Sequence, residues 1–151
     1  MKIESIEYLE ENYGTNPCSE IILKDRQFCN LSEVVVRNGD TLEDLKRKVR
    51  IATILGTLQA TLTDFRYLSK KWKDNTEEEA LLGVSLTGIM DHLVLSGSEY
   101  QVDNGEGSAE FNKHELQDWL NTLREVAIET NKEWSEKLGI NQSVAITCVN
   151  I

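Results

Sequence analysis

The sequence predicts an α/β fold in which parallel strands alternate with long helices. Apolar runs at 27–36, 81–88 and 143–150 have the length and the flanking turn residues of buried strands. Two longer stretches, at 41–72 and 113–138, lie between these runs and carry apolar residues three and four positions apart, as amphipathic helices do. Because strands that alternate with helices form right-handed βαβ units, we expect a βαβαβ segment with a parallel sheet.

Turn and capping residues set the expected limits of the helices. Residues 38–40 (Asn-Gly-Asp) signal a turn, and the Thr41 hydroxyl and the Asp44 carboxylate, three positions apart, form a capping box. The second helix ends before Gly139, which suits a C-terminal cap. Between the two helices we expect a short helix at 89–96, followed by a loop that is rich in glycine and acidic residues.

Composition and charge exclude several classes of protein. The chain has 151 residues, of which 40% are hydrophobic and 28% charged, which describes one globular domain. Its net charge of -10 disfavours non-specific binding to nucleic acid. We find no apolar run of membrane-spanning length and no signal peptide, and the three cysteines are an odd number. These features predict a cytoplasmic protein with reduced thiols and no membrane partner.

The first candidate site lies in a loop that Gly14 and Pro17 keep from being helical. Cys18 and Glu20 are two residues apart in this loop, so a thiol and a carboxylate could face one ligand. A turn with a small buried thiol explains the same spacing. Cys29 follows eleven residues after Cys18 and is either half of a redox couple or a core thiol.

Other candidate residues carry weaker signals. Cys18 and Cys29 do not form a CxxC pair, and His92 and His114 are not at ligand spacing, so no metal site is expected. The glycines at the two ends of residues 83–88 would let a backbone or a ligand approach a strand closely. Cys148, in the last predicted strand, is expected to be structural.

Taken in order, these segments resemble the catalytic subunits of ribonucleotide reductases. The resemblance covers residues 14–149. Its most specific part consists of two motifs: Asn16, Pro17, Cys18, Ser19 and Glu20, and further along the chain Cys29, Asn30 and Leu31. It implies that residues 1–151 are a single segment of a ten-stranded α/β barrel. Residues 14–23 would be the finger loop that projects into the centre of this barrel.

The resemblance also implies a role for each residue of the motif. Cys18 would become the thiyl radical that takes hydrogen from the 3′ carbon of the ribose. Glu20 would accept the proton of the 3′-hydroxyl, and Asn16 would hydrogen-bond the substrate hydroxyls, so that Asn16, Cys18 and Glu20 bind substrate. Cys29 would be half of the redox pair that reduces the 2′ position.

The short gap between Cys18 and Cys29 is similar to that of adenosylcobalamin-dependent (class II) enzymes. The amino-acid sequences of residues 20–23 and 29–33 are most similar to those of the monomeric branch that reduces ribonucleoside triphosphates, with a diphosphate reductase as the alternative. The expected cofactor is therefore adenosylcobalamin, and the expected partners are a ribonucleoside triphosphate and a thioredoxin-type reductant.

Several family features have no match in this sequence. The redox partner of Cys29 is missing, because Cys148 falls on a non-catalytic position of the family. The phosphate-binding Lys-Pro-Ser-Gly-Thr loop is also missing. Because Met1 lies just before the finger loop, we expect a split-gene product or a truncated frame that is inactive alone and needs companion chains to complete the barrel. A non-catalytic assembly module and an unrelated thiol-redox protein are the alternatives.

Overall fold

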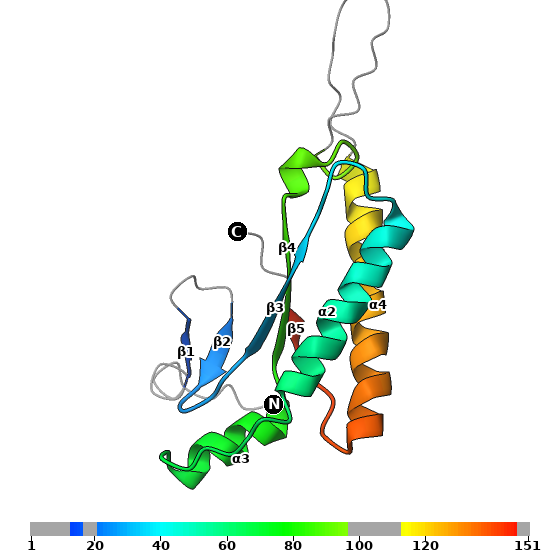
Figure 1. Ribbon diagram of the computed structural model, residues 1–151. Helices are drawn as coiled ribbons and strands as arrows, with labels where there is room; N and C mark the ends of the chain where they lie inside the picture. The colour runs from blue at the N-terminus through cyan, green and yellow to red at the C-terminus, as the bar shows by residue number, and fades with distance from the viewer. Residues whose placement is uncertain (1–12, 17–20, 97–112, 148–151) are drawn as a thin grey trace, which may run out of the picture.

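The computed structural model describes residues 13–16, 21–96 and 113–147. Its centre is a three-stranded sheet in the order β3-β4-β5, with all neighbours parallel. The strands are β3 (Asn30–Val35), β4 (Leu82–Thr87) and β5 (Ile146–Thr147). The helices α2 (Leu42–Gln59) and α4 (Lys113–Leu138) connect them and pack side by side on one face of the sheet (Figure 1). The predicted α/β class and its parallel βαβαβ order are confirmed.

The core lies between this sheet and the two helices. Side chains alternate along a strand, so Val34 and Val36 point toward the helices and are 3% and 2% exposed. They meet Leu45 and Val49 of α2 and Leu123 of α4, among other buried residues. The opposite face of β3 carries Leu31, Glu33 and Val35, all exposed. We call it the hairpin face, because a two-stranded hairpin lies on that side of the sheet (Figure 1).

The helix predicted at 41–72 starts as expected but ends early. The Thr41 hydroxyl accepts a hydrogen bond from the Asp44 amide at 3.2 Å, and the capping box is complete. The helix stops at Gln59, and turns follow up to Ser69. The apolar periodicity continues past this point without burial, since Leu62 is 72% exposed.

A helix that the sequence does not predict, α3 (Lys70–Glu79), follows these turns. It has no apolar stripe, so periodicity could not detect it. Ion pairs one turn apart, Lys70–Asp74 and Lys73–Glu77, support it at 3.6 Å each. The Asn141 side-chain amide donates to the carbonyl oxygens of Glu77 and Glu78, near its C-terminal end.

Three smaller predictions are also corrected. The loop predicted at 14–23 contains two short strands, β1 (Tyr13–Thr15) and β2 (Ile22–Lys24). The strand predicted from residue 27 begins at Asn30, because the two residues after Arg26 contact α3 instead of a neighbouring strand. The short helix predicted at 89–96 is a single 3₁₀ turn, η1 (Ile89–Asp91).

Gly88 marks the point where the chain leaves the sheet. Its φ is +82°, in the left-handed region that favours glycine, and a Cβ atom here would lie 2.8 Å from the Val36 carbonyl oxygen. The backbones of β3 and β4 are therefore in close contact at this end. None of the helices in the described ranges is long and apolar enough to cross a membrane.

Candidate active site at the hairpin and the start of β3

Strands β1 and β2 form an antiparallel hairpin that brings Asn16 next to Ile21. The paired residues run from Tyr13 and Lys24 to Thr15 and Ile22. The ladder continues one step further, where the Asn16 amide donates to the Ile21 carbonyl at 3.3 Å. The Ile21 amide in turn donates to the Asn16 side-chain oxygen at 3.2 Å. Asn16 thus closes the hairpin, a structural role that its place in the motif did not predict.

The remaining finger-motif residues, Pro17, Cys18, Ser19 and Glu20, make up the four-residue connection between Asn16 and Ile21. They lie outside the described residues, as does Cys148. The roles of Cys18 and Glu20 therefore stay predictions. The structure does describe the two residues that flank this connection, Asn16 and Ile21, which are hydrogen-bonded to each other.

Cys29 lies directly before β3 and is half-buried. The next residue, Asn30, is fixed to Leu81 by two hydrogen bonds to the same carbonyl oxygen, from the backbone amide at 2.9 Å and from the side chain at 3.3 Å. Two residues after Cys29, the alternation of β3 exposes Leu31 and then Glu33 on the hairpin face. Cys29 is therefore the residue that leads into the strand whose exposed face lies on the hairpin side.

A polar network joins the base of the hairpin to α3. Gln27, 6% exposed, accepts the Lys24 amide at 2.8 Å and donates to a Glu79 carboxylate oxygen at 2.8 Å. The Lys24 ammonium binds the other Glu79 oxygen and lies 3.5 Å from Glu78. Both carboxylate oxygens of Glu79 are thus satisfied by groups of the hairpin segment.

Opposite charges keep this network ionised. Burial by itself raises the pKa of the Glu79 carboxyl, but the hydrogen bonds from Lys24 and Gln27 and the Lys24 charge outweigh it, so the pKa lies below its ordinary value. The hydrogen bond to Glu79 is also the main reason that the pKa of Lys24 is raised. Both groups are therefore charged at neutral pH.

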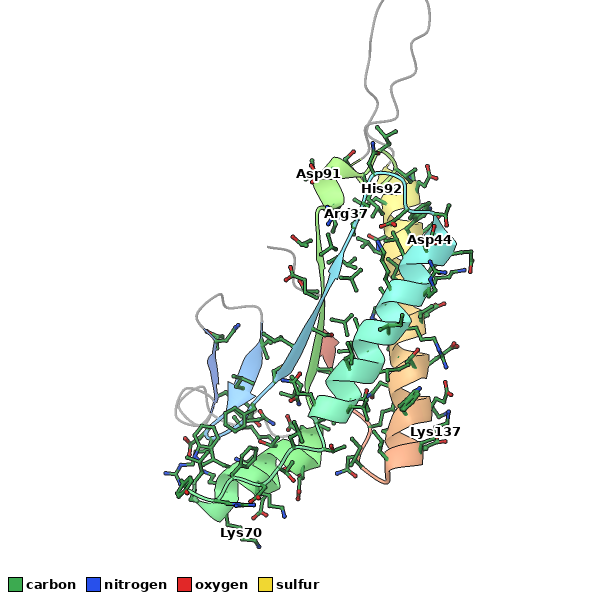
Figure 2. The ribbon with its side chains drawn as sticks, in the orientation of Figure 1. Arg37, Asp44, Lys70, Asp91, His92 and Lys137 are labelled. Atoms are coloured by element: carbon green, nitrogen blue, oxygen red, sulfur yellow. The ribbon has the colours of Figure 1, made fainter. Side chains whose placement is uncertain are left out.

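The two histidines lie away from this site. His92 is buried at the end of the sheet far from α3, on which Lys70 is labelled (Figure 2). Its ring nitrogens are 2.8 Å from the Asp40 carbonyl oxygen and 3.2 Å from the Leu95 amide nitrogen. His114 is exposed near the start of α4. Within the described residues no cluster of three metal-ligating side chains occurs.

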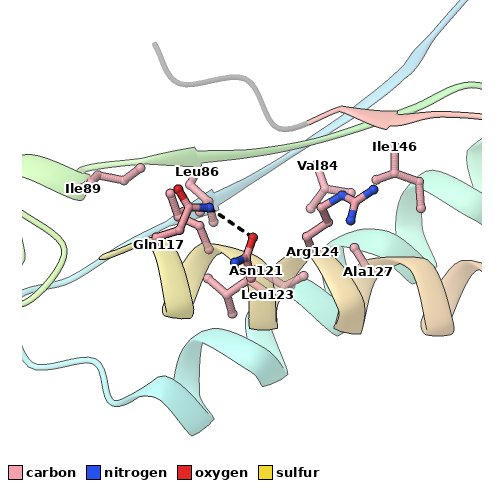
Figure 3. A pocket seen from close by; sticks show the side chains of 11 residues that line it. Val84, Leu86, Ile89, Gln117, Asn121, Leu123, Arg124, Ala127 and Ile146 are labelled. Carbon is pink, nitrogen blue, oxygen red and sulfur yellow. Dashed lines mark hydrogen bonds between the residues drawn. The ribbon is translucent and has the colours of Figure 1, made fainter. Parts of the chain in front are cut away.

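A cavity of about 420 Å³ lies between α4 and β4, on the helix-covered face of the sheet (Figure 3). Its walls are mostly apolar, with Val84 and Leu86 on the sheet side. Gln117, Asn121 and Arg124 of α4 supply its polar groups, and Gln117 donates to Asn121 at 3.1 Å. The sheet separates this cavity from the hairpin, so it does not belong to the candidate site.

Comparison with known proteins places these features in a family. Residues 5–139 match the family model described as the ribonucleotide reductase barrel domain. Adenosylcobalamin-dependent ribonucleoside-triphosphate reductases from Lactobacillus acidophilus and Euglena gracilis are 32% and 29% identical over 151 and 139 residues. A reductase of the same name from Lactobacillus helveticus is 29% identical over 149 residues. No solved structure gives a significant match.

These alignments cover most of this chain but only a small part of each relative. The alignments cover 90% of this chain but only 19%, 16% and 19% of the respective relatives. The chain therefore spans less than a fifth of the length of these proteins. With a family model that matches most of its residues, the chain belongs to the ribonucleotide reductase barrel-domain family.

Proposed function

We propose that this chain is the part of an adenosylcobalamin-dependent ribonucleoside-triphosphate reductase that carries the radical-bearing finger and one redox cysteine. One feature supports the proposal: the finger motif is the connection of a closed hairpin, and Cys29 directly precedes β3, whose exposed face lies on the side of the sheet where the hairpin is. The names of the relatives support the substrate class and the cofactor.

The chemistry assigned to the hairpin is hydrogen and proton transfer at one ribose. The Cys18 thiyl radical would take the hydrogen atom from the 3′ carbon, so that an S–H bond forms and the radical passes to the sugar. Glu20 would accept the proton of the 3′-hydroxyl, while Asn16 would orient the hydroxyls. A hairpin whose ends are hydrogen-bonded to each other suits this task, because hydrogen transfer requires a fixed distance between sulfur and carbon.

Cys29 would supply reducing equivalents at the 2′ position. With a second cysteine it would give two electrons and two protons and become a disulfide, while the 2′-hydroxyl leaves as water. Ribonucleotide and dithiol thus give deoxyribonucleotide, disulfide and water, and a thioredoxin-type reductant would restore the dithiol. The second cysteine would come from a companion chain, because Cys148 falls on a non-catalytic position of the family.

The cavity between α4 and β4 does not fit a cobalamin that acts at the hairpin. The cavity between α4 and β4 has mainly apolar walls and lies on the wrong face of the sheet for a group that acts at the hairpin. We therefore assign the cofactor to companion chains and derive no step of the reaction through it.

Companion chains would also complete the barrel. β3 pairs only with β4 within the described sheet, so its other edge can accept a strand. The ten-stranded barrel would form when further strands add to such edges, in the cytoplasm where deoxyribonucleotides are needed for DNA synthesis. The same edge would serve a non-catalytic assembly module, which is the second candidate function.

Reconstitution tests the proposal. The chain is mixed with companion polypeptides that carry the remaining barrel strands, adenosylcobalamin, a dithiol and a ribonucleoside triphosphate, and deoxyribonucleotide is measured by chromatography. We expect turnover by the mixture and none by the chain alone. Cys18→Ser should abolish turnover but keep partner binding, whereas the matched control Cys148→Ser should keep both.

Other results of this experiment would contradict the proposed function or change it. Turnover that survives Cys18→Ser would refute the radical role. Partner binding without any turnover would favour the assembly module, and a preference for diphosphates would move the chain to the diphosphate-reducing branch.

A further inference from the structure

We infer that α3 positions the active site: it holds the finger hairpin and the Cys29 segment against one support, with Gln27 as the central positioning residue. The inference rests on the proposed function for its catalytic consequence, but not for its structural content. It concerns residues to which the finger motif and the family resemblance give no role.

Gln27 connects the hairpin to α3 with both ends of its amide group. Its oxygen accepts the backbone amide of Lys24, the last paired residue of β2. Its nitrogen donates to the Glu79 carboxylate and, at 3.3 Å, to the Asn75 carbonyl oxygen. Because Gln27 is 6% exposed, water cannot easily replace these partners.

Charged groups repeat this connection around Gln27. Lys24 binds Glu79 directly, so one carboxylate holds both the last paired residue of β2 and Gln27, which follows the turn at Asp25 and Arg26. The turn itself is fixed at a second point, where Asp25 pairs with Lys71 at 3.0 Å and its carbonyl oxygen accepts the Asn75 side chain at 2.7 Å. The base of the hairpin is thus bound to α3 at positions 71, 75 and 79, which lie on one face of the helix.

Cys29 is held to the same support from both sides. Phe28, before it, stacks on Trp72 of α3 with ring centroids 4.7 Å apart, and lies 5.1 Å from Phe65. Asn30, after it, makes its two hydrogen bonds to Leu81, two residues beyond the end of α3. The backbone on either side of Cys29 therefore cannot shift without disturbing contacts with α3 or with the residue that follows it.

α3 is in turn fixed to the rest of the sheet. Ala80, in the left-handed conformation, ends the helix, and only Leu81 separates it from β4. The Val144 amide donates to the Glu79 carbonyl at 3.0 Å, close to the side-chain contacts of Asn141. The hairpin and Cys29 therefore share one support, and this support is attached to the central strand of the sheet.

Amide hydrogen exchange on the full 151-residue chain tests the structural part. In Gln27→Ala we expect the amides of Asn16 and Asn30 to lose protection about tenfold, because three hydrogen bonds at their common support are gone. The Val36 amide, bonded to Thr87 at the far end of the sheet, should change by less than about twofold. Equal loss at all three amides would mean general destabilisation and would overturn the inference.

Two further variants keep the test decisive if Gln27→Ala fails to fold. Glu79→Gln preserves the shape of the network but removes the charge that holds Lys24, and should give the same local pattern with a smaller amplitude. The matched control is Glu78→Gln, since Glu78 is largely exposed and contacts Lys24 only at 3.5 Å. A response of Glu78→Gln as large as that of Glu79→Gln would refute the specific role of the network.

The reconstituted enzyme separates this inference from the proposed function. Gln27→Ala should lower kcat about tenfold and change KM by less than about twofold, since substrate contacts stay while the thiols lose their alignment. Local loss of protection in a chain that never supports turnover would uphold α3 as the support and refute the reductase function. Normal protection and normal kcat in the variant would refute the positioning role.

Discussion

Different kinds of contact stabilise the helix-covered face of the sheet and the hairpin region. At the helix-covered face, α2 and α4 pack on the sheet through aliphatic side chains such as Leu45, Val84 and Leu123. At the hairpin, contacts with α3 are ion pairs, amide hydrogen bonds and one aromatic stack. Apolar packing is strong but tolerant of direction, whereas hydrogen bonds fix direction. The difference places stability on one face and positional precision on the other.

The core should give the largest effect. Leu45 is fully buried in α2, so Leu45→Ala should lower the free energy of unfolding by about 3 kcal/mol through lost burial and a cavity. Urea denaturation followed by circular dichroism measures the change. The control Leu55→Ala, at a position that is 58% exposed on the same helix, should cost less than about 1 kcal/mol. Similar losses for both would show that the helix-covered face is not the main source of stability.

The aromatic stack should come next. Trp72→Ala removes the ring that stacks on Phe28 and should cost about 2 kcal/mol, with the loss of amide protection concentrated at the hairpin and Asn30. Tyr67→Ala is the control, because Tyr67 is 98% exposed and should be neutral. If Trp72→Ala instead loosened α4 as much as the hairpin, the two regions would not be separable.

Acid should weaken the hairpin region through Glu79. Its folded-state pKa lies below the unfolded value of about 4.3, so its ionised form contributes stability above that pH. This contribution is lost as the pH falls through the folded-state pKa. The protection of Asn16 relative to Val36 should therefore decrease below about pH 4. Glu79→Gln should flatten this pH profile, and an unchanged profile would exclude Glu79 as its cause.

The smallest effect is expected from a surface contact between the two long helices. Arg50 of α2 and Glu133 of α4 lie 2.7 Å apart, with half-exposed side chains. A double-mutant cycle with Arg50→Met and Glu133→Gln should give a coupling of about 0.5 kcal/mol that disappears in high salt. A coupling above about 2 kcal/mol would show that directional contacts also dominate the helix-covered face.

The same contrast explains what the sequence could predict. Apolar runs identified the parallel strands and periodic apolar residues the two long helices, because burial leaves a pattern in the sequence, and the capping box at Thr41 marked the start of α2. α3 has no such pattern, and the turns after Gln59 kept an apolar spacing without burial. The finger-motif residues could be named only because they resemble a family.

Gln27 and Glu79 gave no signal in the sequence. Their hydrogen bond joins residues 52 positions apart, and neither residue type is unusual where it stands. Such a pair becomes visible only when the fold brings the hairpin base to the end of α3. Positioning residues of this kind are for this reason harder to predict than the core or the motif that they serve.

Gly88 offers a way to disturb one end of the sheet without touching the other. A single added methyl group would strike the Val36 carbonyl oxygen, and both of these residues lie at the opposite end of β4 from Asn30 and Leu81. In a library randomised at position 88 and selected for folded protein, glycine should therefore dominate the selected variants even where no ligand is present. The loss of stability in Gly88→Ala would then be a reference value, with which the losses caused by substitutions near the thiols could be compared.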